Sequence, residues 1–460
     1  MELDDSLVSM SNAQLRGRRN QENDFIKENG GNDMSEIKRT EVKATEVKNT
    51  EVLHTGCGCG FAPEADKKDG EPEKYTEELA DRLAAERGVR VRPNETISEI
   101  DERGVFVRQP NSFITPFGEK DGELKAEANR FKIFWAHGCH WSNRPVIVRD
   151  ILGLEEVIDD IATTGTGKYG HGFTDQKDFQ DPSTGAYFLS EFYENAKPGF
   201  TGRATTPTLV DVKEKKAVNN DYHRLTNYIE VQFRKFQKTD IDLYPKAYRK
   251  EIDEFNDWLF PTVNNGHYRM HFCLSWVAYD EAYQDFFDAL EKLEERLETN
   301  RFLFGDYITD SDIRLYVTLV RWETSYYHNV GPLKKRIAEY KNIWGYVKDL
   351  FSIPQFKKYT FFEFPKNEFK GHRGWNGSFR ERIAAQVPYE ELWKTDGSRK
   401  KLSADPENVY LHTDVTPEEY QSEISFSKWN LPSWEDRQPR NVSISVDPSI
   451  NPLKGLLKNK

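Results

Sequence analysis

Cys139 is the residue of this chain best placed to do chemistry. It follows an alternating apolar run over 131–135, which is typical of a strand, and Gly138 ends that run. A helical pattern then continues to Gly153, a residue suited to stop a helix. Backbone N–H groups at the start of a helix stabilise a thiolate, which is the reactive form of cysteine. The turn therefore predicts a nucleophilic cysteine; the alternative is a small buried apolar side chain.

Two further thiols, Cys57 and Cys59, are separated by one residue. Such a pair could bind a soft metal or exchange disulfides, but it is short of the four ligands of a closed zinc site. The alternative is a polar tail with two exposed thiols, and we expect no metal. With Cys139 and Cys273 the chain has 4 cysteines, too few for a disulfide scaffold, which favours a reducing cytoplasm.

Composition limits the class of protein. At 460 residues a single core is not expected, so the length favours two domains with extensions. The net charge of -12, without a long basic block, argues against nucleic acid as a partner. No apolar run reaches membrane-spanning length, and the acidic start at 1–5 is unlike a signal peptide, so we expect no membrane partner.

The pattern along the chain predicts five regions. Residues 1–75 are polar and cannot bury enough surface to offset their ordering entropy, which predicts a disordered tail. Residues 76–128 form an arm, and residues 129–235 mix strand-like and helical patterns, as in an α/β domain. Residues 236–350 carry apolar stripes at helical spacing, and residues 351–460 form a weakly structured extension.

Two positions leave a structural and a functional interpretation open. Pro207 directly precedes a strand-like run over 208–211. It is either an ordinary turn proline or a cis-proline that exposes the preceding backbone to a ligand. Asp221 precedes a predicted helix. It either caps that helix, or its backbone neighbours hold the charged end of a ligand.

The order of these features resembles the glutathionyl-hydroquinone reductases, the Xi class of glutathione transferases. The matching segments, spread over about 104–350, are Gly104-Val105-Phe106-Val107-Arg108-Gln109 with Ser112-Phe113; Cys139, Trp141 and Arg144; Gly153-Leu154-Glu155; Leu189-Ser190-Glu191-Phe192-Tyr193; Gly202-Arg203 and Thr205 to Pro207; Val218-Asn219-Asn220; Thr262 to Gly266; Leu293 to Leu297; Gly305-Asp306 with Asp312 to Leu315; and Arg336 to Tyr340. Their shared order and spacing, rather than any one motif, carries the resemblance.

The resemblance implies an α/β plus all-α architecture: a thioredoxin-like N-terminal domain, then a helical glutathione-transferase C-terminal domain, with N- and C-terminal extensions. It implies that Cys139 attacks the sulfur of a glutathionyl conjugate of a quinol, giving hydroquinone and a mixed disulfide that a second glutathione resolves. Glutathione would be the co-substrate, Tyr326 would line the quinol pocket, and the protein would be a homodimer. The thiol-binding residues would be Trp141, His171, Arg203, Thr206, Pro207, Asp221 and Tyr222.

Several residues depart from the pattern of that family. The family site reads Cys-Pro-Trp-Ala-His-Arg, whereas residues 139–144 read Cys-His-Trp-Ser-Asn-Arg, with a proline at Pro145 instead. If Ser142 or Asn143 caps the helix, it starts later and Cys139 lies farther from the helix dipole. His140 would then be either a local cation or base, or a side chain that points to solvent.

The glutathione-binding positions also differ. His171 aligns loosely with the tryptophan that stacks on glutathione in the family, and Asp221-Tyr222 replaces a Glu-Ser pair that grips its γ-glutamyl end. Three hypotheses remain. The chain is a reductase or transferase that uses glutathione in a modified pocket, the same enzyme with another low-molecular-weight thiol, or a non-catalytic ligand-binding relative.

Overall fold

A computed structural model describes residues 75–92, 99–330, 334–362 and 387–413, all within one compact unit. Cys57, Cys59, nearly all of the predicted tail and most of the predicted C-terminal extension lie outside the described residues. None of the helices in the described ranges is both long and apolar enough to cross a membrane.

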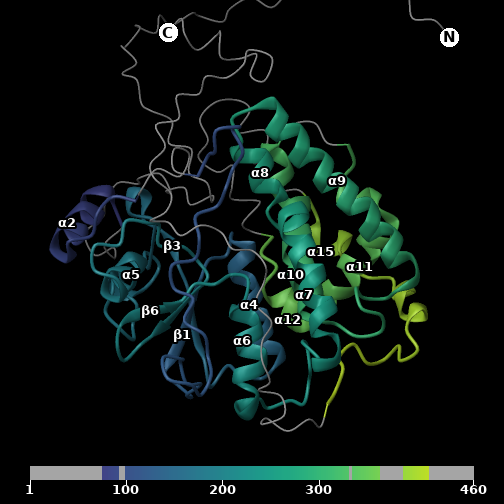
Figure 1. Cartoon of the computed structure of the whole chain (residues 1–460), viewed down its shortest axis with the longest axis horizontal. Coiled ribbons are helices and arrows are strands. Elements are labelled where there is room, and N and C mark those ends of the chain that lie inside the picture. Colours follow the sequence, from purple (N-terminus) through teal and green to yellow (C-terminus); the bar gives the residue numbers. More distant parts are fainter. Residues whose placement is uncertain (1–74, 93–98, 331–333, 363–386, 414–460) are drawn as a thin grey trace, which may run out of the picture. The chain divides into compact units, whose positions relative to one another are not determined.

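A four-stranded sheet forms the centre of the first half of the described chain (Figure 1). Its strands are β1 (Phe131–Trp135), β2 (Asp159–Ala162), β5 (Thr208–Asp211) and β6 (Lys216–Asn219), in the order β2-β1-β5-β6. Strand β1 runs parallel to β2 and antiparallel to β5, which also pairs antiparallel with β6. A two-stranded sheet joins β3 (Thr164–Gly165) to β4 (His171–Gly172).

Helices cover the two faces of the four-stranded sheet. They are α4 (His140–Ile151), α5 (Leu189–Ala196) and α6 (Leu225–Gln232). Phe131, Ile133 and Trp135 share a core with α4 and α6, whereas Phe134 packs with residues of α5. The alternation in the sequence is therefore confirmed: successive side chains of β1 enter opposite cores. A parallel-plus-antiparallel sheet of this kind with helices on both faces is the thioredoxin-like architecture that was expected.

The second half of the described chain is helical. Its helices are α7 (Arg249–Leu259), α8 (Gly266–Phe272), α9 (Trp276–Thr299), α10 (Asp310–Thr324), α11 (Lys341–Phe351), α12 (Pro354–Lys358) and α15 (Tyr389–Leu392); α2 (Glu77–Arg87) precedes the sheet. Short helical turns lie at η2 (Gly167–Tyr169), η3 (Lys177–Phe179), η4 (Arg234–Phe236), η5 (Lys246–Tyr248), η6 (Phe260–Asn264), η7 (Tyr326–Asn329), η8 (Ile337–Glu339) and η9 (Ser398–Leu402).

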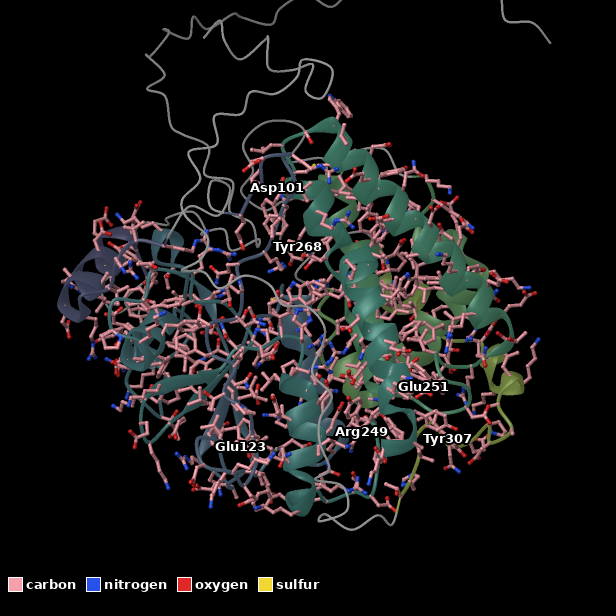
Figure 2. All side chains as sticks on the ribbon, in the orientation of Figure 1. Asp101, Glu123, Arg249, Glu251, Tyr268 and Tyr307 are labelled. Atoms are coloured by element: carbon pink, nitrogen blue, oxygen red, sulfur yellow. The ribbon has the colours of Figure 1, made fainter. Side chains whose placement is uncertain are left out.

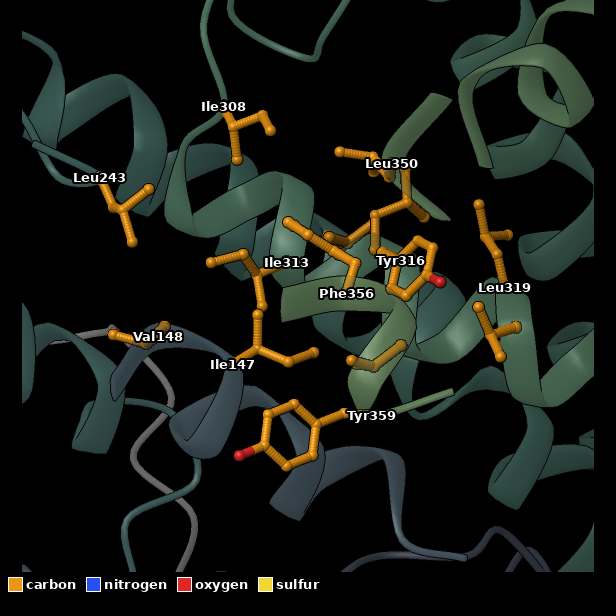
Figure 3. Close-up of a cluster of buried hydrophobic side chains, with 14 of the residues drawn as sticks. Ile147, Val148, Leu243, Ile308, Ile313, Tyr316, Leu319, Leu350, Phe356 and Tyr359 are labelled. Carbon is orange, nitrogen blue, oxygen red and sulfur yellow. The ribbon is translucent and has the colours of Figure 1, made fainter. Parts of the chain in front are cut away.

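Helix α10 packs directly against α4 and joins the two halves of the fold. Figure 3 shows a cluster of buried side chains in which Ile147 of α4 lies next to Ile313 of α10, each with 0% of its surface exposed. Burying one such side chain contributes about 1.5–3 kcal/mol. Because α4 begins directly after Cys139, this packing fixes the turn that carries the cysteine against a buried helix from the second half of the chain.

Candidate active site

Cys139 is the N-cap residue of α4, with an extended backbone and only 4% of its surface exposed. Its thiol donates to the carbonyl oxygen of Thr206, with the sulfur 3.6 Å from that oxygen. Its own carbonyl accepts the backbone N–H groups of Ser142 and Asn143 at 3.1 and 3.2 Å, which closes the first turn of the helix. The expected strand–turn–helix is therefore present, with the sulfur between the helix start and the loop before β5.

The condition for a later helix start, a cap by Ser142 or Asn143, is not met. Helix α4 begins at His140, and Pro145 lies inside it. The Ser142 hydroxyl does not cap the helix because it accepts the backbone N–H of Ala136, at 3.0 Å, and donates back to carbonyls of the same turn. It ties the end of β1 to α4 instead. Cys139 thus lies at the start of the helix, where the dipole is strongest.

A pocket of about 60 Å³ opens beside Cys139. It is lined by Arg92, Phe106, Arg108, Cys139, Trp141, His171, Arg203, Ala204, Thr205, Thr206, Tyr268 and Phe272. The predicted residues Trp141, His171, Arg203 and Thr206 are therefore gathered around the predicted nucleophile. The peptide bond between Thr206 and Pro207 is cis, as one of the two interpretations of Pro207 had it, whereas exposure of the preceding backbone to a ligand stays a prediction. Pro207, Asp221, Tyr222 and Tyr326 are not part of the described lining.

Arg203 already holds a carboxylate. Its guanidinium lies 2.5 Å from a carboxylate oxygen of Glu99, whose side chain has no exposed surface. Gln109 fixes the backbone of Arg203 from both sides, since it accepts its N–H and donates to its carbonyl, each at 3.1 Å. Arg203 is therefore a pocket residue whose guanidinium is paired with a carboxylate, and its contact with a bound thiol stays a prediction. The acid that it binds here comes from the arm of the same chain.

Asp221 and Tyr222 lie behind Trp141 rather than at the pocket. Asp221 accepts the backbone N–H of His223 at 3.0 Å and the Asn111 amide at 3.1 Å, and burial raises the pKa of its carboxyl. The Tyr222 ring packs on that of Trp141, with centroids 5.2 Å apart. Asp221 thus behaves as a turn-stabilising acid here, and its role in binding a thiol stays a prediction.

An aromatic wall closes the side of the pocket formed by the helical half of the chain. Arg108 places its guanidinium 4.9 Å from the ring of Trp141 and 4.4 Å from that of Tyr268, and donates to Asn265 at 2.8 Å. The hydroxyls of Tyr268 and Tyr326 are 3.4 Å apart, and Tyr326 also donates to the carbonyl of Gly138. Figure 2 labels Tyr268 on α8. A flat ring with polar substituents suits such a surface.

Tyr268 and Glu99 were not among the predicted site residues. The signal for Tyr268 was its position shortly after the matching segment that ends at Gly266, on the helix that this segment starts. Nothing near Glu99 in the sequence distinguishes it from other acids of the arm. Among the residues that the structure describes, no group of three His, Cys, Asp or Glu side chains could hold a metal ion.

Comparison with known proteins gives relatives that span most of the described fold. The family model described as "Glutathione S-transferase, C-terminal domain" matches residues 277–349. The chain is 32% identical over 281 residues to glutathionyl-hydroquinone reductase YqjG of Escherichia coli, a match that covers 60% of this chain and 84% of that protein. It is 35% identical over 251 residues to glutathionyl-hydroquinone reductase PcpF of Sphingobium chlorophenolicum, covering 54% and 79%.

The chain belongs to the glutathionyl-hydroquinone reductases, the Xi-class glutathione transferases. Solved structures agree with this assignment. The Xi-class transferase of Phanerochaete chrysosporium superposes with a TM-score of 0.57 at 30% identity, covering 65% of this chain and 97% of that one. A glutathione-bound structure of YqjG superposes with a TM-score of 0.55 at 30% identity, covering 64% and 97%.

His140 stands where the motif of this family has a proline, and it is neither a solvent-facing side chain nor a cation, whereas a role as a base stays a prediction. Its side chain does not point to solvent, because only 1% of its surface is exposed. It is not a cation either: burial, reinforced by the charge of Arg108, holds the pKa of His140 well below its usual range. His140 is therefore a neutral imidazole within the aromatic wall of a Xi-class site.

His171, which aligns loosely with the glutathione-stacking tryptophan of the family, lines the pocket. Its Nδ1 is 3.0 Å from the Thr163 hydroxyl, so one ring nitrogen is hydrogen-bonded within the protein while the ring lines the pocket. The smaller ring leaves less surface for stacking than an indole would. Contact between His171 and a bound thiol stays a prediction.

Proposed function

We propose that this chain is a glutathione-dependent reductase that releases hydroquinones from their glutathionyl conjugates, with Cys139 as the nucleophile. One observation carries the proposal. In a chain that belongs to the glutathionyl-hydroquinone reductases, Cys139 lies at the start of α4 and is hydrogen-bonded to the Thr206 carbonyl. The pocket beside it also contains Arg203, which is paired with a carboxylate. A thiolate in that position is the nucleophile that disulfide-forming chemistry needs.

The reaction has two steps. The Cys139 thiolate attacks the sulfur of the conjugate, an S–S bond forms, and the C–S electron pair leaves with the ring, which also takes up a proton to become hydroquinone. The thiolate of a second glutathione then attacks the glutathionyl sulfur of the mixed disulfide. This gives oxidised glutathione and restores the Cys139 thiolate. The ring is reduced by two electrons while the thioether sulfur of the conjugate and the thiol of one glutathione become one disulfide.

The pocket residues supply binding rather than further covalent chemistry. Arg203 suits a glutathione carboxylate, and the backbone around Thr206, before the cis-proline Pro207, suits the peptide part of the thiol. Trp141 and His171 line the pocket and would contact the tripeptide. Asp221 and Tyr222 lie outside the described lining, and they would support its γ-glutamyl end from behind Trp141, on which Tyr222 packs. Tyr326, with Tyr268, takes the aromatic ring.

The setting of the protein is part of the proposal. Glutathione chemistry of this kind requires a reducing compartment, and the small number of cysteines fits the cytoplasm. We expect a homodimer in which each subunit carries its own Cys139, with small-molecule partners only: glutathione and an aromatic conjugate. The mass of the particle in solution, by light scattering, tests the dimer.

Intact-mass spectrometry tests the chemistry. The protein is incubated with oxidised glutathione, and separately with disulfides of other small thiols, using Cys139→Ser as the control. The expected result is an adduct of one glutathionyl group that the control lacks and that added reduced glutathione removes. An adduct with another thiol alone would identify a different co-substrate. No adduct with any disulfide would make the chain a ligand-binding relative.

A further inference from the structure

His140 carries a buried polar atom without a partner. Its Nε2 has no hydrogen-bond partner among the described residues, although the side chain is 1% exposed. Buried N–H groups in folded proteins nearly always have an acceptor, and an unmatched one costs free energy. The two residues beside it in the chain, Cys139 and Trp141, both line the pocket. His140 itself is not part of the described lining, but its ring packs against Trp141 and Tyr268, with centroids 4.4 and 5.6 Å away, and both of those rings line the pocket. A ligand seated in the pocket is therefore the candidate acceptor.

The other nitrogen of the ring is held from α10. The Thr318 hydroxyl lies 3.1 Å from His140 Nδ1, and Asn264 donates to that hydroxyl at 2.7 Å. The single Thr318 proton has two possible acceptors, Nδ1 at 3.1 Å and the Arg314 carbonyl at 3.4 Å. The shorter contact favours Nδ1 as the acceptor. In a neutral imidazole this leaves the proton on Nε2, which is then a hydrogen-bond donor.

The ring stands in the part of the site that suits an aromatic substrate. Its centroid is 5.6 Å from that of Tyr268 and 5.5 Å from that of Tyr326. Arg108, Arg144 and Arg321 all exert a positive potential on this position. A neutral donor surrounded by fixed cations is suited to stabilise an oxygen that becomes negative during a reaction.

Cleavage of the conjugate produces such an oxygen. When the conjugate reacts as its keto tautomer, the carbon bonded to sulfur also carries hydrogen and neighbours a carbonyl group. Attack by Cys139 forms the S–S bond, and the C–S electron pair moves through the ring onto the carbonyl oxygen, which becomes a phenolate. That oxygen then takes a proton to give hydroquinone. Stabilising the phenolate lowers the barrier to the first step and leaves the second step, thiol exchange at sulfur, unaffected.

We propose that the Nε2–H of His140, oriented by Thr318 and Asn264, donates a hydrogen bond to the ring oxygen of the quinol conjugate and stabilises it as the C–S bond breaks. This inference rests on the proposed function, because it assigns a group to its first step. It gives His140 a role that the proline of the family motif cannot fill, because proline has no side-chain donor.

Two assays on the same protein separate the steps. The first follows glutathione-dependent reduction of the mixed disulfide of glutathione and 2-mercaptoethanol, which has no ring and needs only Cys139. The second follows hydroquinone release from a glutathionyl-hydroquinone. His140→Phe keeps an aromatic ring and removes the donor. Thr318→Val removes the hydroxyl that orients His140. Thr324→Val is the matched control, because Thr324 is also buried in α10 but donates only to the Val320 carbonyl, at 2.7 Å.

The expected result is a split between the assays. His140→Phe lowers kcat for hydroquinone release about 100-fold and leaves disulfide reduction within about twofold of wild type. Thr318→Val lowers hydroquinone release about tenfold, since the donor remains but is less well oriented. Thr324→Val changes neither activity. Equal losses in both assays would show that His140 only supports the Cys139 turn, and unchanged hydroquinone release in His140→Phe would show that it takes no part; either overturns the inference.

Failure of the proposed function gives a different pattern. If the wild-type protein reduces the mixed disulfide but releases no hydroquinone, both the proposed function and the inference about His140 are overturned, whatever the variants do. A direct measurement of hydroquinone binding at His140 does not depend on the activity of any variant. In protein labelled with ¹⁵N-histidine, one Nε2–H resonance that is absent from His140→Phe is expected to move when hydroquinone is added. A resonance that stays in place would overturn the inference.

Discussion

The proposed thiol side and the proposed quinol side of the site, called the thiol side and the quinol side below, are built in different ways. The thiol side consists of Cys139, Arg203 and Thr206, which come from the β1–α4 turn and from the loop before β5, two neighbouring strands of one sheet. The quinol side consists of His140, Tyr268 and Tyr326 and depends on helices from the second half of the chain. The first is set by local backbone geometry, whereas the second exists only after α4 and α10 have packed.

The largest loss of activity on the thiol side is expected when the sulfur of Cys139 is replaced. Cys139→Ser is expected to lower turnover about 10³-fold or more in both the mixed-disulfide and the hydroquinone assays, because a hydroxyl is a far weaker nucleophile at neutral pH. Ser is nearly isosteric, so the melting temperature is expected to stay unchanged. The contrast with His140→Phe, expected to affect one assay alone, is the measurement. Full turnover of Cys139→Ser on the conjugate would remove Cys139 from the mechanism.

Substitution of Arg203 tests whether this residue binds glutathione or only pairs with Glu99 of the arm. Arg203→Met leaves the Glu99 carboxylate buried without its cation, which is expected to cost about 3–5 kcal/mol in the free energy of unfolding and to raise KM for glutathione. Glu99→Gln combined with Arg203→Met removes both charges. Most of the stability is then expected to return, measured by urea unfolding, while KM stays high. A normal KM in the double variant would make Arg203 a purely structural partner of Glu99.

The smallest effect is expected at Cys273, a half-buried thiol outside the thiol side. Burial raises the pKa of Cys273 to about 11. At pH 8 only about 0.1% of it is thiolate, and this fraction rises about tenfold with each pH unit up to pH 10. In a variant with Cys57→Ser and Cys59→Ser, iodoacetamide is expected to label Cys139 alone at pH 8, read by peptide mass spectrometry, and Cys273 only as pH approaches 10. Equal labelling of both thiols at pH 8 would contradict this.

The sequence predicted the thiol side better than the quinol side for a physical reason. An alternating run over 131–135, a glycine and a helical pattern are local signals, and they placed Cys139 correctly at a strand–turn–helix. The proline before a strand-like run led to the cis bond at Pro207. Each of these features is determined by the backbone preferences of a few consecutive residues, and the sequence shows them directly.

The quinol side and the arm depend on contacts between distant residues. Thr318 meets His140 across 178 positions, and Glu99 meets Arg203 across 104. No local pattern encodes either contact. The sequence left the start of α4 conditional for a related reason: Ser142 is a good capping residue by type, but in the folded chain its hydroxyl bonds to Ala136, just after β1. Its bonding partners, rather than its propensity, decided where the helix begins.

The first turn of α4 has a consequence for how such a site can change over time. An α-helix rotates about 100° from one residue to the next. Cys139, His140 and Trp141 therefore point in three directions although they are encoded side by side, and each contacts a different neighbour: Thr206, Thr318 and Tyr222. A substitution in the middle codon of the three thus alters the surroundings of the aromatic substrate without moving the nucleophile. Acceptance of new ring substituents can evolve, or be engineered, at position 140 while the handling of glutathione is inherited unchanged.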